Sequence, residues 1–490
     1  MKPEDIDRIE DLDALKALLR ELIGVIEALR QTIERKEQEL AELRRLLFGP
    51  KSERLPSVQS ELKKRRDGRR EGADPEQTAA KRQSARRARR ELPTEEVVHE
   101  VGEQELRCPH CGGTEFVDLP DEVSFEYEFV PSRLLRRRHL RQKKACRCGQ
   151  HIVTAPGPAR VSEGVQYGPG LHAHVVVAKC LDSLPLYRQA QALSRAGVKM
   201  QRSTLCDLFH RSAELLEPLH RRMLELIKAS RYVRADETPQ PVLDKGKTHR
   251  GYMWNFNTDE AVAYVFSEGR SGETPAAVLG ASGGFLQTDD YSGYNRVTTP
   301  EGRTRVGCWA HVRRKFFEAK ELAPEECGHA LDAILNLYEV EYRAAEENIL
   351  GSERHLAMRR SESRRIVEAF REWLDAQKER FAPRSPMGQA VGYALNHWAT
   401  LIRFLEDANL PLDNNMSERL LRVIALGRKN FLFVGHNGAG HNLAVLQSLV
   451  STCQINGVDP QAYLTDVLIR IQTHPRSRID ELLPQCWQPP

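Results

Sequence analysis

Three carboxylates of the chain stand where their side chains could share metal ions. Asp236 and Asp289 each follow an apolar segment with the pattern of a strand, and Glu418 follows Asp413 where a helix is expected to begin. Carboxylates about 4 Å apart repel by about 4 kcal/mol per pair at an effective dielectric of 20, so such a cluster needs protons or cations. Hard oxygen ligands select Mg²⁺ or Mn²⁺, and two such ions about 3.5–4 Å apart can assist displacement at phosphorus. The three acids therefore predict an enzyme that cuts and joins nucleic acid strands.

Each acid has an alternative interpretation. Asp290 directly follows the second acid and is a rival ligand there. Glu237 directly follows the first acid, although a shift by one residue would place it on the opposite face of the strand. Arg422 follows Glu418 by four residues, so an ordinary surface ion pair between them is the alternative to metal binding.

Two pairs of cysteines have spacings that suit a zinc site. Two residues separate the first pair, and one residue separates the second pair, which is tighter than usual. Four thiolates suit a tetrahedral Zn²⁺ site with bonds of ~2.3 Å. The alternative is two unrelated reduced pairs, and His110 and His151 are possible substitute ligands. The predicted ligands are Cys108, Cys111, Cys146 and Cys148.

Residues 1–50 carry a heptad repeat. Ten of its eleven seam positions are apolar over about five heptads, and Lys36 is the exception. This repeat predicts a two-stranded parallel coiled coil, and hence a homodimer or a higher oligomer. The alternative is an amphipathic helix packed against its own globular body. The seam positions are Leu12, Leu15, Leu19, Leu22, Ile26, Leu29, Ile33, Lys36, Leu40, Leu43 and Leu47.

Residues 51–95 have the composition of a flexible basic linker. Apolar residues nearly vanish between 62 and 91, where twelve Lys and Arg residues form two clusters. Such a segment cannot bury a core, and its cations suit contacts to phosphates that do not depend on DNA sequence. If six to ten of them met phosphates, affinity would fall roughly 10³- to 10⁵-fold between 50 and 200 mM salt. Residues 96–160 then hold the predicted zinc-binding module.

Residues 161–230 have a helical pattern. A helix over Leu186–Ala196, a turn at Gly197 and a second helix from Ser203 to His210, with Ser203 as N-cap, fit a helix-turn-helix. A helical hairpin that serves packing alone fits equally well. The DNA contacts predicted in this region are Lys199, Arg202 and His210.

Residues 231–435 predict a catalytic domain with the strand and helix order of a ribonuclease-H-like fold. The first and fourth strands of that fold are adjacent, which would place Asp236 beside Asp289. The elements expected are a strand over Tyr232–Asp236, a hairpin of Gly251–Asn257 and Ala261–Phe266, a helix over Thr274–Leu279, strands over Gly284–Asp289 and Thr304–Cys308, and a helix over Ala310–Lys320. Residues 324–406 predict a helical insertion, with Trp373 and Trp398 on apolar faces.

Further cations and a histidine near these elements are candidate DNA contacts. His311 could approach a phosphate, or it could be a packed histidine between a strand and a helix. Phe431 and Phe433 could stack on bases, although a buried strand over 427–435 is the simpler interpretation. Residues 436–490 predict a helical C-terminal segment without evident chemistry. The additional candidates are His311, Arg313, Arg314, Arg428 and Lys429.

Four stretches resemble the transposases of the insertion sequence 66 family, which are bacterial DDE enzymes. They are Ala235–Pro239, Leu286–Asn295, Gly307–Glu318 and Asp413–Arg422, and the resemblance runs from about Cys108 to the C-terminus. It implies an Asp-Asp-Glu triad with the acid directly after Leu-Gln-Thr as its second member, Asp289 rather than Asp290. The family has a zinc-finger-like module, usually with two residues inside the second cysteine pair. Its members bind the inverted-repeat ends of their element, cleave them, transfer the strands and are encoded beside small accessory proteins.

The leading hypothesis is therefore a multidomain α+β transposase that acts on double-stranded DNA. One alternative is a zipper-dimerised, zinc-containing DNA-binding regulator with a vestigial catalytic core, and another is a ribonuclease-H-like nuclease without strand transfer. The chain has 40% apolar and 29% charged residues, no evident secretion signal, and no apolar run near the ~20 residues of a membrane span. We expect a cytoplasmic, nucleoid-associated bacterial protein without a membrane partner.

Overall fold

A computed structural model describes residues 16–17, 19–29, 55–67, 114, 134–145, 147, 151–161 and 166–489. The chain divides into two compact units: residues 59–136 form one, and the catalytic region lies in the other, which includes residues 137–490. The four predicted zinc cysteines and most of the predicted coiled coil and linker lie outside the described residues. Residues 19–29 are helical with exposed seam positions, and α3 (Val58–Asp67) is a helix at the start of the segment predicted as a linker.

A five-stranded mixed sheet forms the centre of the catalytic region. Its order is β5-β4-β3-β6-β7, so the first and fourth strands of the region are adjacent, as predicted. The central strand runs antiparallel to β4 and parallel to β6. The strands are β3 (Tyr232–Asp244), β4 (Lys247–Asn257), β5 (Val262–Ser267), β6 (Phe285–Gln287) and β7 (Thr304–Val306).

The first two strands are longer than predicted, because they form a hairpin of their own. The prediction of a strand ending at Asp236 was wrong: β3 continues to Asp244 and pairs with β4 from Arg234 to Asp244. Lys245 and Gly246 close the turn with φ values of 42° and 83°. Two successive residues with positive φ make the type I′ turn that matches the twist of a tight hairpin.

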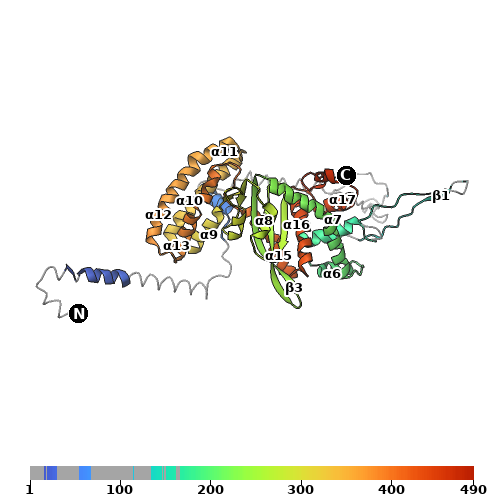
Figure 1. The fold of residues 1–490 in the computed structure, drawn as a ribbon, viewed down its shortest axis with the longest axis horizontal. Helices are drawn as coiled ribbons and strands as arrows, with labels where there is room; N and C mark the ends of the chain where they lie inside the picture. Colours follow the sequence, from blue (N-terminus) through green and yellow to red (C-terminus); the bar gives the residue numbers. More distant parts are fainter. Residues whose placement is uncertain are drawn as a thin grey trace. The chain divides into compact units, whose positions relative to one another are not determined.

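Three helices pack against the sheet, one from before the catalytic region, one from within it and one from after it. These are α7 (Arg202–Ala229), α15 (Asn415–Phe431) and α16 (Asn437–Ile455), and Figure 1 shows them beside the sheet. Ser448 and Thr452 of α16 accept the backbone N–H groups of β5 residues Tyr264 and Val262, at 2.7 and 3.0 Å. These side-chain bonds fasten the C-terminal segment to the edge strand of the sheet.

The helix-turn-helix candidate consists of α6 (Leu186–Arg195) and the long α7, joined through Gly197, whose φ is +86°. The prediction of Ser203 as N-cap was wrong: α7 begins at Arg202 with Gln201 at the cap position. The apolar stripe of α7 is buried in the main core together with α5 (Pro169–Cys180) and α17 (Pro460–Arg470).

Helices fill the chain between β7 and α15, as predicted for the insertion. They share a core of their own, on which Trp373 and Trp398 pack as expected, and Figure 1 shows the group apart from α7, α16 and α17. Arg359–Ser363 within it is a π-helical turn. The helices are α9 (Trp309–Ala319), α10 (Pro324–Glu346), α11 (Glu353–Met358), α12 (Arg364–Arg380), α13 (Pro386–Asn396) and α14 (Trp398–Leu401).

The prediction of a buried strand over 427–435 was wrong. α15 continues to Phe431, Leu432 adopts a left-handed φ of 61°, and Phe433 is 36% exposed. Only Val434 pairs with a strand, in an isolated bridge to Val242 of β3. The smaller elements are β1 (Lys143–Ala145), β2 (Ile152–Thr154), α8 (Glu273–Leu279) and the 3₁₀ turns Ser292–Arg296, Ile402–Leu405 and Arg476–Leu482. Within the described residues, none of the helices combines the length and apolar character of a membrane span.

Candidate active site

The register of two parallel strands brings the first two predicted acids to the same level of the sheet. Arg234 of β3 lies opposite Gln287 of β6 in the last pair of the parallel ladder. Asp236 and Asp289 each lie two residues beyond that pair, so they share an alternation phase and the same edge. Neighbouring strands are about 4.8 Å apart, which makes these two acids neighbours across the end of the ladder.

Asp236 is half-buried on β3, just beyond the end of its pairing with β6. Its Oδ1 accepts the backbone N–H of Glu237 at 2.8 Å. Burial and the negative charges of Glu237, Asp289 and Glu418 together raise the pKa of Asp236 to about 8, against the opposing effect of that single hydrogen bond. Desolvation is the largest cause, and charge repulsion comes second. The other two predicted acids therefore both act electrostatically on the first.

Hydrogen bonds from the start of α15 to the sheet hold Glu418 near Asp236. Asn414, which precedes the helix, donates its side-chain N–H to the carbonyl of Ala235 at 2.9 Å. Ser417 accepts from the buried amide of Asn257 on β4 at 2.8 Å. Glu418 stands next to Ser417 in the first helical turn, where the partial positive charge of the helix N-terminus favours a carboxylate.

A third buried amide extends this network to the register partner of the first acid. Asn257 donates to the side-chain oxygen of Asn255 at 2.6 Å. Asn255 lies opposite Asp236 in the β3–β4 ladder and is fully buried. Sequence reasoning missed both asparagines, because their role depends on which strand pairs with which.

The loop that carries Asp289 is held by one arginine that the sequence analysis did not single out. Arg305 of β7 donates to the carbonyl oxygens of Asp289 and Tyr291, each at 2.8 Å. The same guanidinium contacts Thr288 at 3.2 Å and Asn295 at 2.8 Å. Asp289 also accepts the backbone N–H of Tyr291 at 3.0 Å, which closes a tight turn behind the acid. The resembling stretch Leu286–Asn295 is thus one hydrogen-bonded loop.

The two rival acids have partners of their own. Glu237 is 1% exposed, accepts from the hydroxyl of Tyr294 at 2.7 Å and forms an ion pair with Arg270 at 2.5 Å. Asp290 lies 3.0 Å from the ring nitrogen Nε2 of His397 in the helical insertion. Each rival carboxylate is therefore occupied by a positively charged or hydrogen-bonding group of the protein.

The three candidate acids are neighbours, but their side chains do not form a metal-binding cluster as they stand. In the part of the chain that is described, no group of three or more His, Cys, Asp or Glu side chains is close enough to hold a metal ion. A cation shared by the three would have to draw their carboxylates together.

The candidate contacts on α9 differ in accessibility. His311 lies with Nε2 3.7 Å from Glu418 Oε1, at the border of the acidic group. Arg313 is 3% exposed, so a direct phosphate contact is closed to it, whereas Arg314 is exposed on the surface. The sequence pattern did not distinguish these two neighbouring arginines.

The remaining candidate DNA contacts lie away from the acids. Lys199 and Arg202 are exposed around the connection of α6 and α7, and Lys429 is exposed near the end of α15. His210 instead makes internal contacts, with Asn442 at 2.6 Å and with the ring of His436 at 5.8 Å, and burial lowers its pKa. Arg428 donates to the carbonyl of Pro239 in β3.

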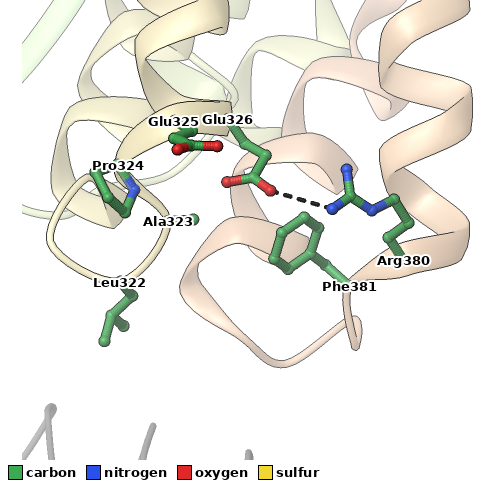
Figure 2. Close-up of a pocket in the computed structure, with 7 residues that line it drawn as sticks. All are labelled: Leu322, Ala323, Pro324, Glu325, Glu326, Arg380 and Phe381. Carbon is green, nitrogen blue, oxygen red and sulfur yellow. Dashed lines mark hydrogen bonds and ion pairs between the residues drawn. The ribbon is translucent and has the colours of Figure 1, made fainter.

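A surface hollow lies in the helical insertion rather than at the acids, as Figure 2 shows. Glu326 and Arg380 form an ion pair of 3.2 Å across it, which is their evident role. The hollow is lined by Leu322, Ala323, Pro324, Glu325, Glu326, Arg380 and Phe381.

Comparison with known families finds three matches that follow one another along the chain. Residues 105–149 match the zinc-finger binding domain of transposase IS66, residues 164–442 match the transposase IS66 family, and residues 448–485 match the IS66 C-terminal element. The first match spans all four predicted zinc cysteines, and the second spans all three candidate acids.

Two relatives from Sinorhizobium fredii extend the likeness over nearly the whole chain. The uncharacterized protein y4hP is 30% identical, over 92% of this chain and 88% of its own length. The uncharacterized protein y4jD is 32% identical, over 94% of this chain and 96% of its own length. With a family model matched over more than half of its length and relatives of this extent, the chain belongs to the IS66 transposase family.

Proposed function

We propose that this protein is a DDE transposase that binds the inverted-repeat ends of its element, cleaves them and transfers the strands to target DNA. The observation that carries the proposal is the approach of Asp289 and Glu418 to the half-buried Asp236. Three segments separated by more than fifty residues each contribute one acid to this place. The sheet order, in which the first strand lies between the second and the fourth, supports a ribonuclease-H-like catalytic core.

The charge of the acidic group fits divalent cations. Burial and three neighbouring carboxylates raise the pKa of Asp236 to about 8, which indicates a group that lacks compensating positive charge. Asp236, Asp289 and Glu418 would hold two Mg²⁺ or Mn²⁺ ions, which would supply charge stabilisation at the attacking and leaving oxygens. Arg305 keeps the Asp289 loop in place, and His311 stands where it can hydrogen-bond to Glu418 or to a phosphate oxygen.

The zinc-finger match supports structural zinc in the N-terminal half of the protein. We assign its ligands to Cys108, Cys111, Cys146 and Cys148. Zinc would fold this small module, because thiolate binding contributes directly to the folding free energy of such domains. Family membership likewise supports DNA as the partner. Contacts by Lys199, Arg202, Arg314 and Lys429, dimerisation through residues 1–50 and accessory proteins of the same element belong to the proposal.

Nicking of a plasmid that carries the flanking sequences of the gene tests the proposal. The wild type should nick at the element ends only with Mg²⁺ or Mn²⁺ present, and Asp236→Asn, Asp289→Asn and Glu418→Gln should each lose about 10²-fold or more of the rate. All three should keep DNA binding and the wild-type thermal midpoint. Asp290→Asn is the matched control and should stay within a few-fold of wild type, because Asp290 contacts His397.

The outcomes separate the competing functions. Nicking that Asp236→Asn leaves unchanged would remove that residue from the site. DNA binding by the wild type without any nicking would favour a regulator with a vestigial core. Nicking without joining of the freed 3′ ends to a second plasmid would favour a nuclease.

A further inference from the structure

The β3–β4 hairpin continues well beyond the rest of the sheet. β6 pairs only with Tyr232–Arg234 of β3, and β5 pairs only with Tyr252–Asn257 of β4. The outer part of the hairpin is therefore a two-stranded ribbon, which Figure 1 shows projecting from the sheet. A two-stranded ribbon has a size that fits the major groove of DNA.

The tip of this ribbon is basic and exposed. Lys245, Lys247 and Arg250 are exposed there, together with a single acid, Asp244. The turn at Lys245-Gly246 is tight and well defined, so these cations sit on a stiff element rather than on a loose loop.

The C-terminal end of α15 lies against the same ribbon. Arg428 donates to the carbonyl of Pro239, Val434 N–H donates to the carbonyl of Pro241 at 3.0 Å, and Leu243 N–H donates to the carbonyl of Val434 at 2.9 Å. These bonds bring the segment after the helix alongside β3. The exposed Lys429 and Phe433 belong to this segment, between the two residues that bond to β3.

Leu432 is the unusual residue of this segment. It is 64% exposed, and its φ of 61° with ψ of −50° places it at the centre of a strained γ-turn, closed by the Phe433 N–H bond to the carbonyl of Phe431 at 2.7 Å. An exposed leucine in such a conformation gains nothing from the core of this protein. Strained, exposed positions of this kind concentrate where a protein contacts a ligand.

We infer that the hairpin tip and the end of α15 form a DNA-binding arm, defined by Lys245, Lys247, Arg250, Lys429 and Leu432. The four cations bind backbone phosphates of double-stranded DNA. Leu432 acts as an apolar wedge against the base stack, as inserted leucine side chains do in proteins that deform DNA. This inference rests on the proposed function, because it assumes that the same DNA reaches the acids.

The geometry also predicts where the arm meets the DNA. Both elements start at the acids and lead away from them to the arm. From Asp236 to Asp244 the chain advances eight residues (244 − 236), or about 26 Å at strand rise. From Glu418 to Leu432 it advances fourteen residues (432 − 418), or about 21 Å at helical rise. At about 3.4 Å per base pair, the contact lies roughly six to eight base pairs from the cleaved bond.

The salt dependence of DNA binding tests the cationic part of the arm in the full-length protein. The variant Lys245→Asn/Lys247→Thr/Arg250→Thr removes three charges with residues that suit a type I′ turn and a strand. Binding to a fluorescein-labelled 40-base-pair duplex of mixed sequence is measured by fluorescence anisotropy from 50 to 200 mM NaCl. The slope of log affinity against log salt should fall in magnitude by up to about 2.7, since each phosphate contact contributes about 0.9.

A charge-matched control lies in the helical insertion. Arg364→Ala/Arg365→Ala/Lys378→Ala also removes three exposed charges, and its slope should equal that of the wild type. If the hairpin variant keeps the wild-type slope of log affinity against log salt, at an unchanged thermal midpoint, the proposed arm is refuted. An equal loss of slope in both variants would also overturn it, because the effect would then reflect net charge alone.

The wedge is tested with Leu432→Gly, which removes the side chain and relieves the positive-φ strain. A duplex containing the end sequence and 2-aminopurine six to eight base pairs from the terminus should fluoresce more strongly with the wild type, because the base unstacks. Leu432→Gly should lose that increase at an equal or higher thermal midpoint, while Leu350→Ala, an exposed leucine elsewhere, should keep it. Full fluorescence with Leu432→Gly would refute the wedge.

The inactive variant Asp236→Asn separates the arm from the catalytic proposal. It should keep both the salt slope and the 2-aminopurine signal. A wild type that fails to nick but shows both arm signals would refute the proposed activity and leave the arm in place. Normal nicking with neither arm signal would refute the arm alone.

Discussion

Asp236 is the central residue of the candidate site, because burial and neighbouring negative charges both raise its pKa. Desolvation is the largest influence on its pKa, and the carboxylates of Glu237, Asp289 and Glu418 add to it. Burial also raises the pKa of Glu237, but hydrogen bonds from Tyr294 and Arg270 oppose that rise. Glu237 therefore has donors from the protein itself, whereas Asp236 is left for a cation or a proton.

Replacement of Arg305 should distinguish the positioning of Asp289 from the binding of DNA, because Arg305 holds the loop that carries this acid. Arg305→Leu removes four hydrogen bonds from the loop of Asp289, and a displacement of an acid by about 1 Å can cost about 10²-fold in rate. We expect nicking to fall about 10- to 10²-fold while the dissociation constant for the end duplex stays within a few-fold. Arg305→Lys should restore little, because an ammonium lacks the planar fork of donors.

Arg296→Leu is the control for this loop. Arg296 is an exposed arginine with a long, 3.8 Å contact to Glu273, so its loss should leave the nicking rate unchanged. Wild-type nicking by Arg305→Leu would mean that the loop holds its conformation without the guanidinium.

Among the elements, the packing of α5 against α7 contains a histidine that should make the fold sensitive to acid. His172 is fully buried, and its Nδ1 lies 3.0 Å from Ser212 Oγ. Ser212 donates its own proton to the carbonyl of Leu208 at 2.7 Å, so His172 Nδ1–H is the donor and Nε2 stays unprotonated. Within the described residues, Nε2 has no hydrogen-bond partner, and burial lowers the pKa of His172 to about 4.

The depressed pKa of His172 determines the sign of this pH dependence. The unfolded chain takes up a proton below its ordinary pKa of about 6.5, whereas the folded chain does so only near 4. The free energy of unfolding is therefore undiminished above about pH 6.5 and falls by about 3 kcal/mol between pH 6.5 and 4.

His172→Gln should lessen the fall of the thermal midpoint between pH 6.5 and 4 by several °C relative to wild type. Differential scanning fluorimetry across this range measures the effect. His174→Gln, on an exposed position of the same helix, should keep the wild-type dependence. Parallel pH curves for wild type and His172→Gln would mean that the buried imidazole does not carry the acid sensitivity.

At the scale of the whole molecule, the part of the chain from α5 onward, here called the C-terminal body, contains hydrophobic cores of its own. One buried cluster joins α5, α7, α16 and α17 to the sheet, and another fills the helical insertion. The matched zinc-finger segment ends at residue 149, before both of them. We therefore expect the stability of the body to be largely independent of zinc.

Removal of the zinc ligands tests this division. The full-length protein should contain about one Zn²⁺ per chain by inductively coupled plasma mass spectrometry, since four thiolates make one tetrahedral site. Cys108→Ser/Cys111→Ser should lose it and bind the end duplex more weakly, while the main thermal transition remains. Cys327→Ser, at a buried cysteine of the insertion, should retain the zinc. Full zinc content in the double variant would exclude the assigned ligands.

Much of the catalytic region was predictable because its signals are local. Alternating apolar residues indicated β4 and β5, and the ends of α8 and α9 were placed within one or two residues. The order of these elements was enough to predict that the first and fourth strands are adjacent. The burial of Arg313 beside an exposed Arg314 was not predictable, because it depends on how α9 meets the helical insertion.

By itself, the sequence determined most of the elements, the family and the choice of candidate acids, because these follow from residue types at short spacing. Only the tertiary structure decided the strand register that places Asp236 beside Asp289. It also decided which groups contact Glu237 and Asp290, and that residues 428–434 lie along β3. These features arise from contacts between residues tens to hundreds of positions apart. Local periodicity carries no information about such pairings, because many partners satisfy the same pattern of burial.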